Sequence, residues 1–437
     1  MKSPRVVQRR IGSCTHPTQA NVIGVLERFL PAALGHNFRW LFAASTASNL
    51  GDGVLLTAGP LLVASLTRDP LAVSMAVFAQ RLPWLLFGLI AGSVVDRVDR
   101  RKLVMGADAA RAVVLIVLFA LLITDHISLL SVYAAFFLLG TAETFVDNAA
   151  STLSVAVVPR AHLGTANSRL LGTSMITNQM AGPPLGAALF TVATGLAFGA
   201  YAVLLLLAVV LTSRMRLPLR QPRPTGVSMR KEIREGTVWL WRHAPVRTLA
   251  LMITIFNVTY GAVVGLYVLY AQERLEVGDL GFGVLMSMVA IGAVLGSALY
   301  SRLERRFRYA TLLRAGLVLE TVSHAALALT HSAIVAAIIL FLFGVHAAIW
   351  GTTSTTVRQL AVPEHMLGRV NSVYMLGSLG GIAIGTLIGG ALASQFGLLS
   401  AFWFAFGGSL IALAFLWKPM DHVAHAAEVA DPSPTVG

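Results

Sequence analysis

Charged residues and cysteine are both scarce in this sequence. Only 12% of its 437 residues are charged, whereas 56% are hydrophobic and the mean hydropathy is +0.75. Soluble globular domains are usually about 25% charged, so the composition excludes that class and predicts an all-α membrane protein. The single cysteine, Cys14, excludes an internal disulfide framework and a cysteine-based metal centre. We therefore expect no metal and no cofactor.

Acidic residues are scarcer than basic ones, and the formal net charge is +13. A strongly basic protein can bind nucleic acid, but here the Lys and Arg residues stand in the short turns between apolar segments. Membrane topology already explains basic residues in those places. We expect the lipid bilayer as a partner and no nucleic acid.

Twelve apolar segments are long enough to cross a bilayer as helices. They cover residues 40–66, 71–95, 103–124, 129–158, 166–192, 194–212, 248–272, 280–300, 309–330, 332–357, 367–394 and 397–417. The predicted organisation is a tail over 1–37, a six-helix half over 38–212, a linker over 213–247, a second six-helix half over 248–417 and a tail over 418–437.

The distribution of charge predicts which loops face the cytoplasm. Lys and Arg dominate the loop over 96–102 and the linker over 213–247, whereas the loops near Arg68, Asp125 and Glu273 carry almost no net positive charge. Short basic loops stay in the cytoplasm. We therefore expect both termini on the cytoplasmic side.

An internal repeat predicts the architecture. Pro159-Arg-Ala-His-Leu-Gly-Thr-Ala-Asn-Ser168 aligns without a gap with Pro363-Glu-His-Met-Leu-Gly-Arg-Val-Asn-Ser372. A repeat of this kind, placed before the fifth apolar segment of each half, indicates two parallel six-helix repeats. Substrate sites in such folds lie near the membrane midplane between the repeats.

The loop over Gly92–Lys102 carries the sequence Gly-Ser-Val-Val-Asp-Arg-Val-Asp-Arg-Arg-Lys. Its Gly-x3-Asp-Arg-x2-Arg-Arg spacing resembles the signature of the major facilitator superfamily between transmembrane helices 2 and 3. The resemblance implies a major facilitator fold, twelve transmembrane helices in two six-helix pseudo-symmetric halves. The residues expected to act in gating are Gly92, Asp96, Arg97, Arg100 and Arg101.

Asp96 has a specific expected partner within this loop. A helix N-terminus attracts carboxylates, so we expect Asp96 to meet the start of the eleventh helix, near Leu367 and Gly368, when the cytoplasmic side is closed. The alternative is that the loop is an anchor whose basic residues only fix topology.

The fifth apolar segment contains Gly182-Pro-Pro-Leu-Gly186-Ala187. It resembles part of the motif associated with antiporters of the superfamily, although Ala187 and Asn178 replace two of its expected glycines. Pro183 should kink the helix, and Gly182 and Gly186 should allow close helix packing between the halves. The partial motif favours an exporter over an importer.

Acidic residues inside membrane segments are costly and are therefore functional candidates. Asp52 lies in the first segment, and Glu143 and Asp147 lie one helical turn apart in the fourth. Two adjacent acids repel each other when both are charged, which favours a proton on one of them. With Arg81 as counter-charge, these three acids are the predicted proton-coupling residues. The alternative is a static buried ion pair between Arg81 and one of the acids.

Polar and aromatic residues predict a substrate cavity between the halves. The candidates on the first, seventh and tenth segments are Asn49, Asn257, Tyr260, His346 and Trp350. Aromatic side chains of this kind suit an amphipathic organic molecule, but each residue could instead make an ordinary hydrogen bond between helices. Glu320 and His324, on the ninth segment, are interpreted as a local structural pair, with a second proton site as the alternative.

Over nearly the whole membrane region the chain resembles bacterial drug and siderophore exporters, including macrolide-efflux and enterobactin-exporter-like proteins. The resemblance implies a monomeric, proton-coupled exporter, or antiporter, of small amphipathic molecules in the bacterial inner membrane, and with it multidrug resistance. A proton-coupled importer or facilitator is the alternative, and an intramembrane enzyme or a sensor is more remote. Neither Gly-x-Ser-x-Gly nor His-Glu-x-x-His occurs, so no enzymatic activity is expected.

Overall fold

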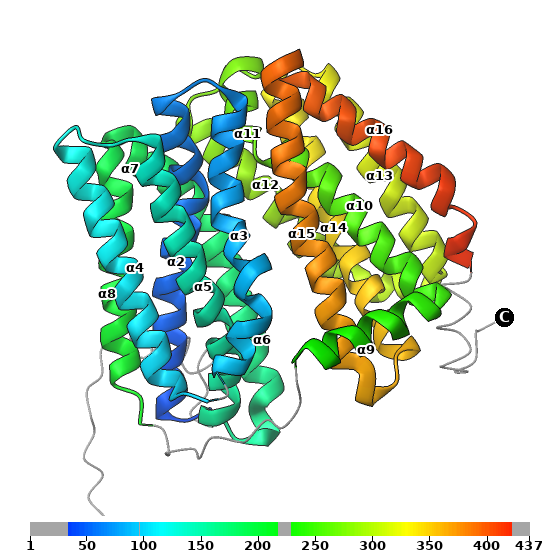
Figure 1. Cartoon of the computed structure of the whole chain (residues 1–437), viewed down its shortest axis with the longest axis horizontal. Coiled ribbons are helices and arrows are strands. Elements are labelled where there is room, and N and C mark those ends of the chain that lie inside the picture. Colours follow the sequence, from blue (N-terminus) through cyan, green and yellow to red (C-terminus); the bar gives the residue numbers. More distant parts are fainter. Residues whose placement is uncertain (1–33, 96, 217–228, 422–437) are drawn as a thin grey trace, which may run out of the picture.

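The computed structural model describes residues 34–95, 97–216 and 229–421. Every regular element among these residues is a helix. The helices form two bundles that lie side by side (Figure 1). Residue 96 and the two tails, 1–33 and 422–437, fall outside the described residues, as does the segment over 217–228.

The first bundle contains the helices before the linker. They are α2 (His36–Leu66), α3 (Pro70–Val95), α4 (Arg100–Ile123), α5 (Leu129–Val157), η2 (Arg160–His162), α6 (Leu163–Ser174), η3 (Met175–Ala181), α7 (Gly182–Val192) and α8 (Thr194–Ser213).

The second bundle begins with a helix inside the linker and continues with the helices of the second half. They are α9 (Met229–Arg242), α10 (Ala244–Val264), α11 (Tyr267–Leu269), η4 (Tyr270–Arg274), α12 (Asp279–Arg306), α13 (Tyr309–Leu329), α14 (Ala333–Ala361), α15 (Glu364–Phe396) and α16 (Leu399–Leu416).

Eleven helices in the described part of the chain are long and apolar enough to cross a membrane. A twelfth crossing is made by α6, η3 and α7 in succession, none of which is long enough alone. The predicted fold of twelve membrane helices in two six-helix halves is confirmed. Both ends of the described chain lie on the side of the linker: Asn37 donates a hydrogen bond to the Arg216 carbonyl at 2.8 Å, and Arg314 pairs with Asp421 at 2.8 Å.

The break in the fifth crossing follows from its local sequence. Pro183 has no backbone N–H, so a regular α-helical ladder cannot continue through it. The chain widens into the π-helical segment η3, and the Gly182 N–H bonds to the Thr177 carbonyl. The sequence predicted a kink at Pro183; the structure places a whole π-helical segment before it. Such segments are frequent at functional sites.

The glycines around this break bring two helices into backbone contact. A Cβ atom on Gly182 would lie 2.5 Å from the Cα of Gly53 in α2, and one on Gly186 would lie 2.4 Å from the Val54 carbonyl oxygen. The Thr57 hydroxyl donates to the Pro183 carbonyl at 2.8 Å. These contacts hold α7 against α2 at a distance that only glycine permits.

The two bundles meet along two seams, α3 with α15 and α7 with α12. Ser287 in α12 donates to the Met180 carbonyl at 2.9 Å. At the end of the bundles remote from the linker, Arg68 donates to Gln272 at 2.5 Å and Ser394 donates to Asp69 at 2.9 Å. Polar contacts between the halves therefore close this end.

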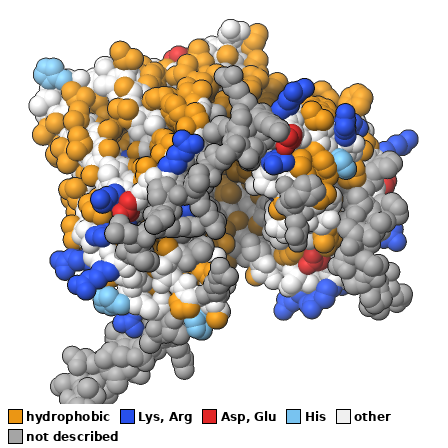
Figure 2. All heavy atoms as spheres, turned by 60° about the horizontal axis from the view of Figure 1, so that its bottom comes forward, with side chains coloured by type: hydrophobic (Ala, Val, Ile, Leu, Met, Phe, Trp, Pro, Cys, Tyr) orange, Lys and Arg blue, Asp and Glu red, His pale blue; other side chains and the backbone are white. Residues whose placement is uncertain are grey.

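The opposite end is open. In Figure 1 the halves diverge toward α6 and α9. Figure 2 brings this end forward and shows a hollow between the halves, with hydrophobic side chains at its bottom and Lys and Arg side chains around its rim. The structure is therefore closed at one membrane face and open at the face that carries the linker.

Part of the linker forms the helix α9, which the sequence analysis did not predict. α9 packs against α15, where a Cβ on Gly236 would lie 2.6 Å from the Arg369 carbonyl oxygen. Arg369 also pairs with Glu235 at 2.7 Å. Trp241 and Val238 on α9 are exposed.

Candidate functional site

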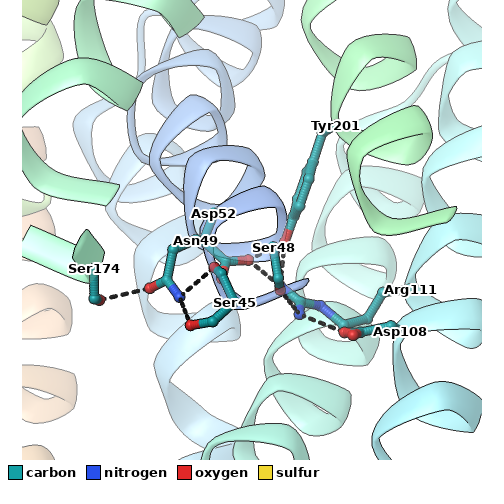
Figure 3. A network of polar contacts seen from close by, with 8 residues as sticks. All are labelled: Ser45, Ser48, Asn49, Asp52, Asp108, Arg111, Ser174 and Tyr201. Carbon is teal, nitrogen blue, oxygen red and sulfur yellow. Dashed lines mark hydrogen bonds and ion pairs between the residues drawn. The ribbon is translucent and has the colours of Figure 1, made fainter. Parts of the chain in front are cut away.

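A cluster of charged side chains lies inside the first bundle, where α2, α4 and α8 pack together (Figure 3). Arg111 of α4 donates to the Asp52 carboxylate of α2 and to the Tyr201 hydroxyl of α8, and Tyr201 in turn donates to Asp52. The second arm of the Arg111 guanidinium donates to Asp108 at 3.1 Å. Ser48 lies 3.5 Å from the same nitrogen. We call Asp52, Asp108, Arg111 and Tyr201 the Arg111 cluster.

The Arg111 cluster contains one acid more than it has bases. Arg111 and Asp108 are each only 2% exposed, while the Asp52 side chain is 15% exposed. With both carboxylates ionised, the cluster carries a net negative charge in a low-dielectric interior, which is costly. One proton makes it neutral. Of the two acids, Asp52 is the more accessible to a proton from water.

Sequence reasoning identified Asp52 but missed the other three members of the Arg111 cluster. Asp108 and Arg111 stand in the segment over 103–124, which was treated as an uninterrupted apolar run. An acid and a base three residues apart inside a membrane helix are themselves a functional signal. Tyr201 carried no signal of its own, because only the fold brings α8 to α2.

Arg81 is not the ion-pair partner of Asp52, since Arg111 holds that position. Arg81 is half-buried in α3 and forms no ion pair within the described residues. Its charge acts on Glu143 and Asp147 of α5 and on Tyr260 of the other half. Arg81 therefore acts electrostatically on both halves.

Glu143 and Asp147 lie one turn apart on α5, next to the Arg111 cluster. Both interact electrostatically with Asp52 and Arg111, and with each other. Glu143 is half-buried, and Asp147 has an exposed side chain. The three predicted acids thus share one electrostatic environment that reaches the surface at Asp147.

Asn49 and Asn257 each join two helices of their own half. The Asn49 carboxamide accepts a hydrogen bond from Ser174 of α6 at 2.6 Å and donates to Ser45. Asn257 donates to Ser378 of α15 at 3.1 Å. Both halves therefore use an amide and a serine to fasten the first crossing to the fifth, which is the alternative role considered for these residues.

An aromatic layer lines the second bundle between α10 and α14. Phe256 stacks on Trp350 with centroids 5.7 Å apart, and Tyr260 stacks on Phe343 at 5.4 Å. Phe256 and Tyr260 are half-buried, whereas Trp350 and His346 are only 3% and 2% exposed. The expected cavity residues His346 and Trp350 are thus buried in the present conformation, and their contact with a substrate remains a prediction.

The Gly182 motif lies between α2 and α12. On the α12 side, a Cβ on Gly283 would be 2.8 Å from both the Pro183 carbonyl oxygen and the Ala187 Cβ. Pro183 and Gly186 are buried. The motif therefore packs both within its own half and against the other half. A change in the angle between the bundles would alter these contacts.

The loop between α3 and α4 fastens three helices. Asp99 caps α4 by accepting from the backbone N–H groups of Arg101 and Lys102 at 2.9 and 3.2 Å. The Arg101 side chain donates to the Thr212 carbonyl at 3.2 Å and to that of Ser213, at the C-terminus of α8. Gly92 belongs to α3, and Arg97 and Arg100 take part in contacts of their own. Asp96 lies outside the described residues, so its contact with Leu367 and Gly368 remains a prediction.

No group of three or more His, Cys, Asp and Glu side chains within residues 34–95, 97–216 and 229–421 is arranged to hold a metal ion. The side chains described above offer proton binding, hydrogen bonding and aromatic contact.

A family model described as transmembrane secretion effector matches residues 30–433. Among curated relatives, the multidrug efflux pump Tap of Mycolicibacterium fortuitum is 29% identical over 83% of this chain and 90% of its own. The enterobactin exporter EntS of Shigella boydii serotype 18 is 26% identical over 87% of this chain and 91% of its own. Macrolide efflux protein A of Streptococcus pyogenes is 24% identical over 88% of this chain and 95% of its own.

Solved structures show the same fold at lower sequence identity. The nucleoside transporter NupG has a TM-score of 0.70 at 13% identity, over 89% of this chain and 99% of its own. A bacterial homologue of the iron transporter ferroportin has a TM-score of 0.70 at 16% identity, over 88% of this chain and 98% of its own. The fold, the two halves and the family match all point to a transporter and not to an enzyme. The chain belongs to the transmembrane secretion effector family of major facilitator transporters.

Proposed function

We propose that the protein exports amphipathic small molecules, such as drugs or siderophore-like metabolites, in exchange for protons by alternating access. The observation that carries this proposal is the excess acid of the Arg111 cluster, which adjoins Glu143 and Asp147. A charge imbalance buried in a membrane protein favours reversible protonation. The efflux function of the relatives Tap, EntS and macrolide efflux protein A supports the direction of transport.

Proton binding at Asp52 would change the hydrogen bonds that Arg111 makes. When Asp52 is ionised, Arg111 is shared among Asp52, Asp108 and Tyr201 across three helices. A proton on Asp52 would weaken the hydrogen bond between Asp52 and Arg111, because hydrogen bonds between charged partners are roughly twice as strong as neutral ones. The packing of α2 against α4 and α8 then depends on the proton.

Side chains of α10 and α5 support the proposed substrate class. Phe256 and Tyr260 offer half-buried aromatic faces on α10, while Glu143 and Asp147 offer carboxylates on α5. An amphipathic molecule with an aromatic or apolar body and a polar or cationic group would fit both sides. Substrate arriving beside these acids would compete with the coupling proton, which is the linkage that exchange requires.

The open end is assigned to the cytoplasm in this proposal. Lys and Arg side chains gather there (Figure 2), and the linker sequence is rich in both residues, as expected of cytoplasmic loops. The present conformation would then receive substrate from the cytoplasm of a bacterial cell, with both termini on the same side. Rocking of the halves about the seams α3–α15 and α7–α12 would expose the site to the other face. Each proton that enters down the membrane potential releases about 2.3 kcal/mol per 100 mV.

Removal of single acids tests the coupling role. In proteoliposomes with an imposed pH gradient, Asp52→Asn and Glu143→Gln should abolish gradient-driven ethidium transport but retain ethidium binding and ethidium exchange without a gradient. Asp421→Asn is the matched control, because its carboxylate is exposed and pairs with Arg314 at the end of the bundle. If Asp52→Asn, Glu143→Gln and Asp147→Asn each keep wild-type gradient-driven transport, these acids do not carry the proton.

A further inference from the structure

A second group of ionisable side chains lies buried in the other half, between α13 and α14. The Glu320 carboxylate contacts His324 Nε2 at 3.0 Å through one oxygen and lies 3.4 Å from His346 Nε2 through the other. Glu320 and His324 are fully buried, and His346 is 2% exposed. One carboxylate thus stands between two imidazoles.

The hydrogen-bonding capacity of this group is far from filled. His324 Nε2 hydrogen-bonds to Glu320, but the Glu320–His346 contact is an ion-pair distance without hydrogen-bond geometry. His324 Nδ1, His346 Nδ1 and one Glu320 oxygen also have no hydrogen-bond partner. Buried polar groups are normally satisfied, and the unfilled sites here all belong to ionisable groups whose donor and acceptor roles change with protonation.

The surroundings offer no cation to balance Glu320. The charges acting most strongly on Glu320 are those of His324 and His346. The segments of α12 and α16 over 283–299 and 399–416 contain no charged residue. The other ionisable groups that face Glu320 are Tyr260 and Tyr267, whose hydroxyls add no positive charge.

The basic residues of α13 and α14 themselves are engaged elsewhere. Arg314 pairs with Asp421, and Arg358 hydrogen-bonds to Asn371 and lies over the Tyr374 ring. A buried, uncompensated carboxylate is costly. A proton held by one of the two histidines makes the group of three neutral, and the carboxylate between them can stabilise it on either side.

The group also contacts the aromatic layer from behind. The His346 ring meets the Phe343 ring at 4.9 Å in an edge-to-face arrangement, and it meets Phe256 at 6.1 Å. A protonated imidazole within about 6 Å of an aromatic ring is attracted by the face of that ring. His346 therefore contacts the aromatic layer mainly through Phe343, with Phe256 slightly farther away.

We propose that Glu320, His324 and His346 form a proton-binding site of the second half, in which two histidines share one proton across a single carboxylate. It is separate from the Arg111 cluster, which lies in the other half. The shared proton links Glu320 and His324 of α13 with His346 of α14. It also determines the charge of this group next to the aromatic layer. The sequence analysis interpreted Glu320 and His324 as a local structural pair; His346 from the neighbouring helix turns that pair into a site.

The protonation states of the histidines test this directly. The full-length protein, labelled with 15N-histidine and reconstituted in lipid nanodiscs, would be examined by NMR at neutral pH, with the two signals assigned by their loss in His324→Gln and His346→Gln. We expect one imidazolium shared by the two residues, and its loss in Glu320→Gln. His331→Gln, which removes an exposed histidine of the same half, should leave the signal unchanged.

Two results would overturn the proposal. One is that both histidines are neutral in the wild-type protein from mildly acidic to mildly alkaline pH, as in a plain hydrogen-bonded pair. The other is that an equimolar addition of Zn²⁺ replaces the imidazolium with a metal-bound signal, which would make this a metal site. Because His324→Gln and His346→Gln each assign one signal independently, a single variant that fails to fold does not prevent the test. Asp52→Asn should leave the imidazolium in place, so the result is independent of the proposed function of the first half.

Discussion

Arg111 is the residue on which the charge balance of the first half depends. Replacement by Gln would leave Asp52 and Asp108 as two buried carboxylates without a cation. Loss of one partner from a buried ion pair costs about 3–5 kcal/mol. We therefore expect Arg111→Gln to lower the melting temperature and the folded yield strongly, as measured by size-exclusion chromatography after heating.

The matched comparison for this prediction is Arg314→Gln, because Arg314 and Asp421 form an exposed pair worth about 1 kcal/mol or less. The double variant Arg111→Gln with Asp52→Asn should recover part of the lost stability, since it removes one of the two unpaired charges. Wild-type stability in Arg111→Gln alone would show that the cluster is not charged as argued.

Single residues were predicted unevenly from the sequence, for a physical reason. Asp52, Glu143 and Asp147 could be identified because an acid in an apolar segment is costly wherever the helix lies. The partners of Asp52 come from α4 and α8, and the third member of the Glu320 group comes from α14. Such side-chain contacts depend on how helices that are distant in the sequence pack against one another. A single sequence does not reveal that packing.

At the scale of helices, the contact of α2 with α7 gives the sharpest prediction. Gly182→Ala would place a methyl group 2.5 Å from the Gly53 backbone, where neither helix can yield without shifting. Overpacking of this kind typically costs about 1–3 kcal/mol. We expect a lower melting temperature together with a reduced transport rate.

Gly172→Ala provides the control within the same membrane crossing. A Cβ at Gly172 would meet no atom within 4 Å, and alanine favours a helix over glycine. This variant should be as stable as the wild type or slightly more so. Equal effects of the two substitutions would argue against a special role for the contact at Gly182.

Helix positions were predictable to a large extent, because apolar length alone defines most of the spans. Eleven continuous helices correspond to eleven of the predicted segments. The break at η3 and the linker helix α9 were not predicted. η3 depends on how Pro183 is accommodated against α2, and α9 is a short helix that packs against α15.

For the whole molecule, the contacts at the closed end define the conformation. Asp69 and Ser394 hydrogen-bond across the two halves at 2.9 Å. In a background with Cys14→Ser, the pair Asp69→Cys and Ser394→Cys should form a disulfide readily and hold this end closed. We expect transport to stop on oxidation and to return on reduction.

Each of the two single cysteine variants should transport normally under both conditions, which separates the crosslink from the substitutions. The same proteoliposome assay and a gel-shift measurement of disulfide formation suffice. A fully crosslinked protein that still transports at the wild-type rate would show that the closed end does not open during the cycle, and it would contradict alternating access.

Exchange of substrate for protons determines the direction of ethidium flux in a pH gradient, and that direction can be measured. Wild-type proteoliposomes with an acidic lumen would be given ethidium outside; its permanent charge prevents passive accumulation by pH trapping. With proton exchange, ethidium should enter and accumulate as protons leave, whichever way the protein is inserted, and a protonophore or Asp52→Asn should abolish this uptake. Accumulation with an alkaline lumen instead, or a flux indifferent to the gradient, would contradict proton-coupled exchange.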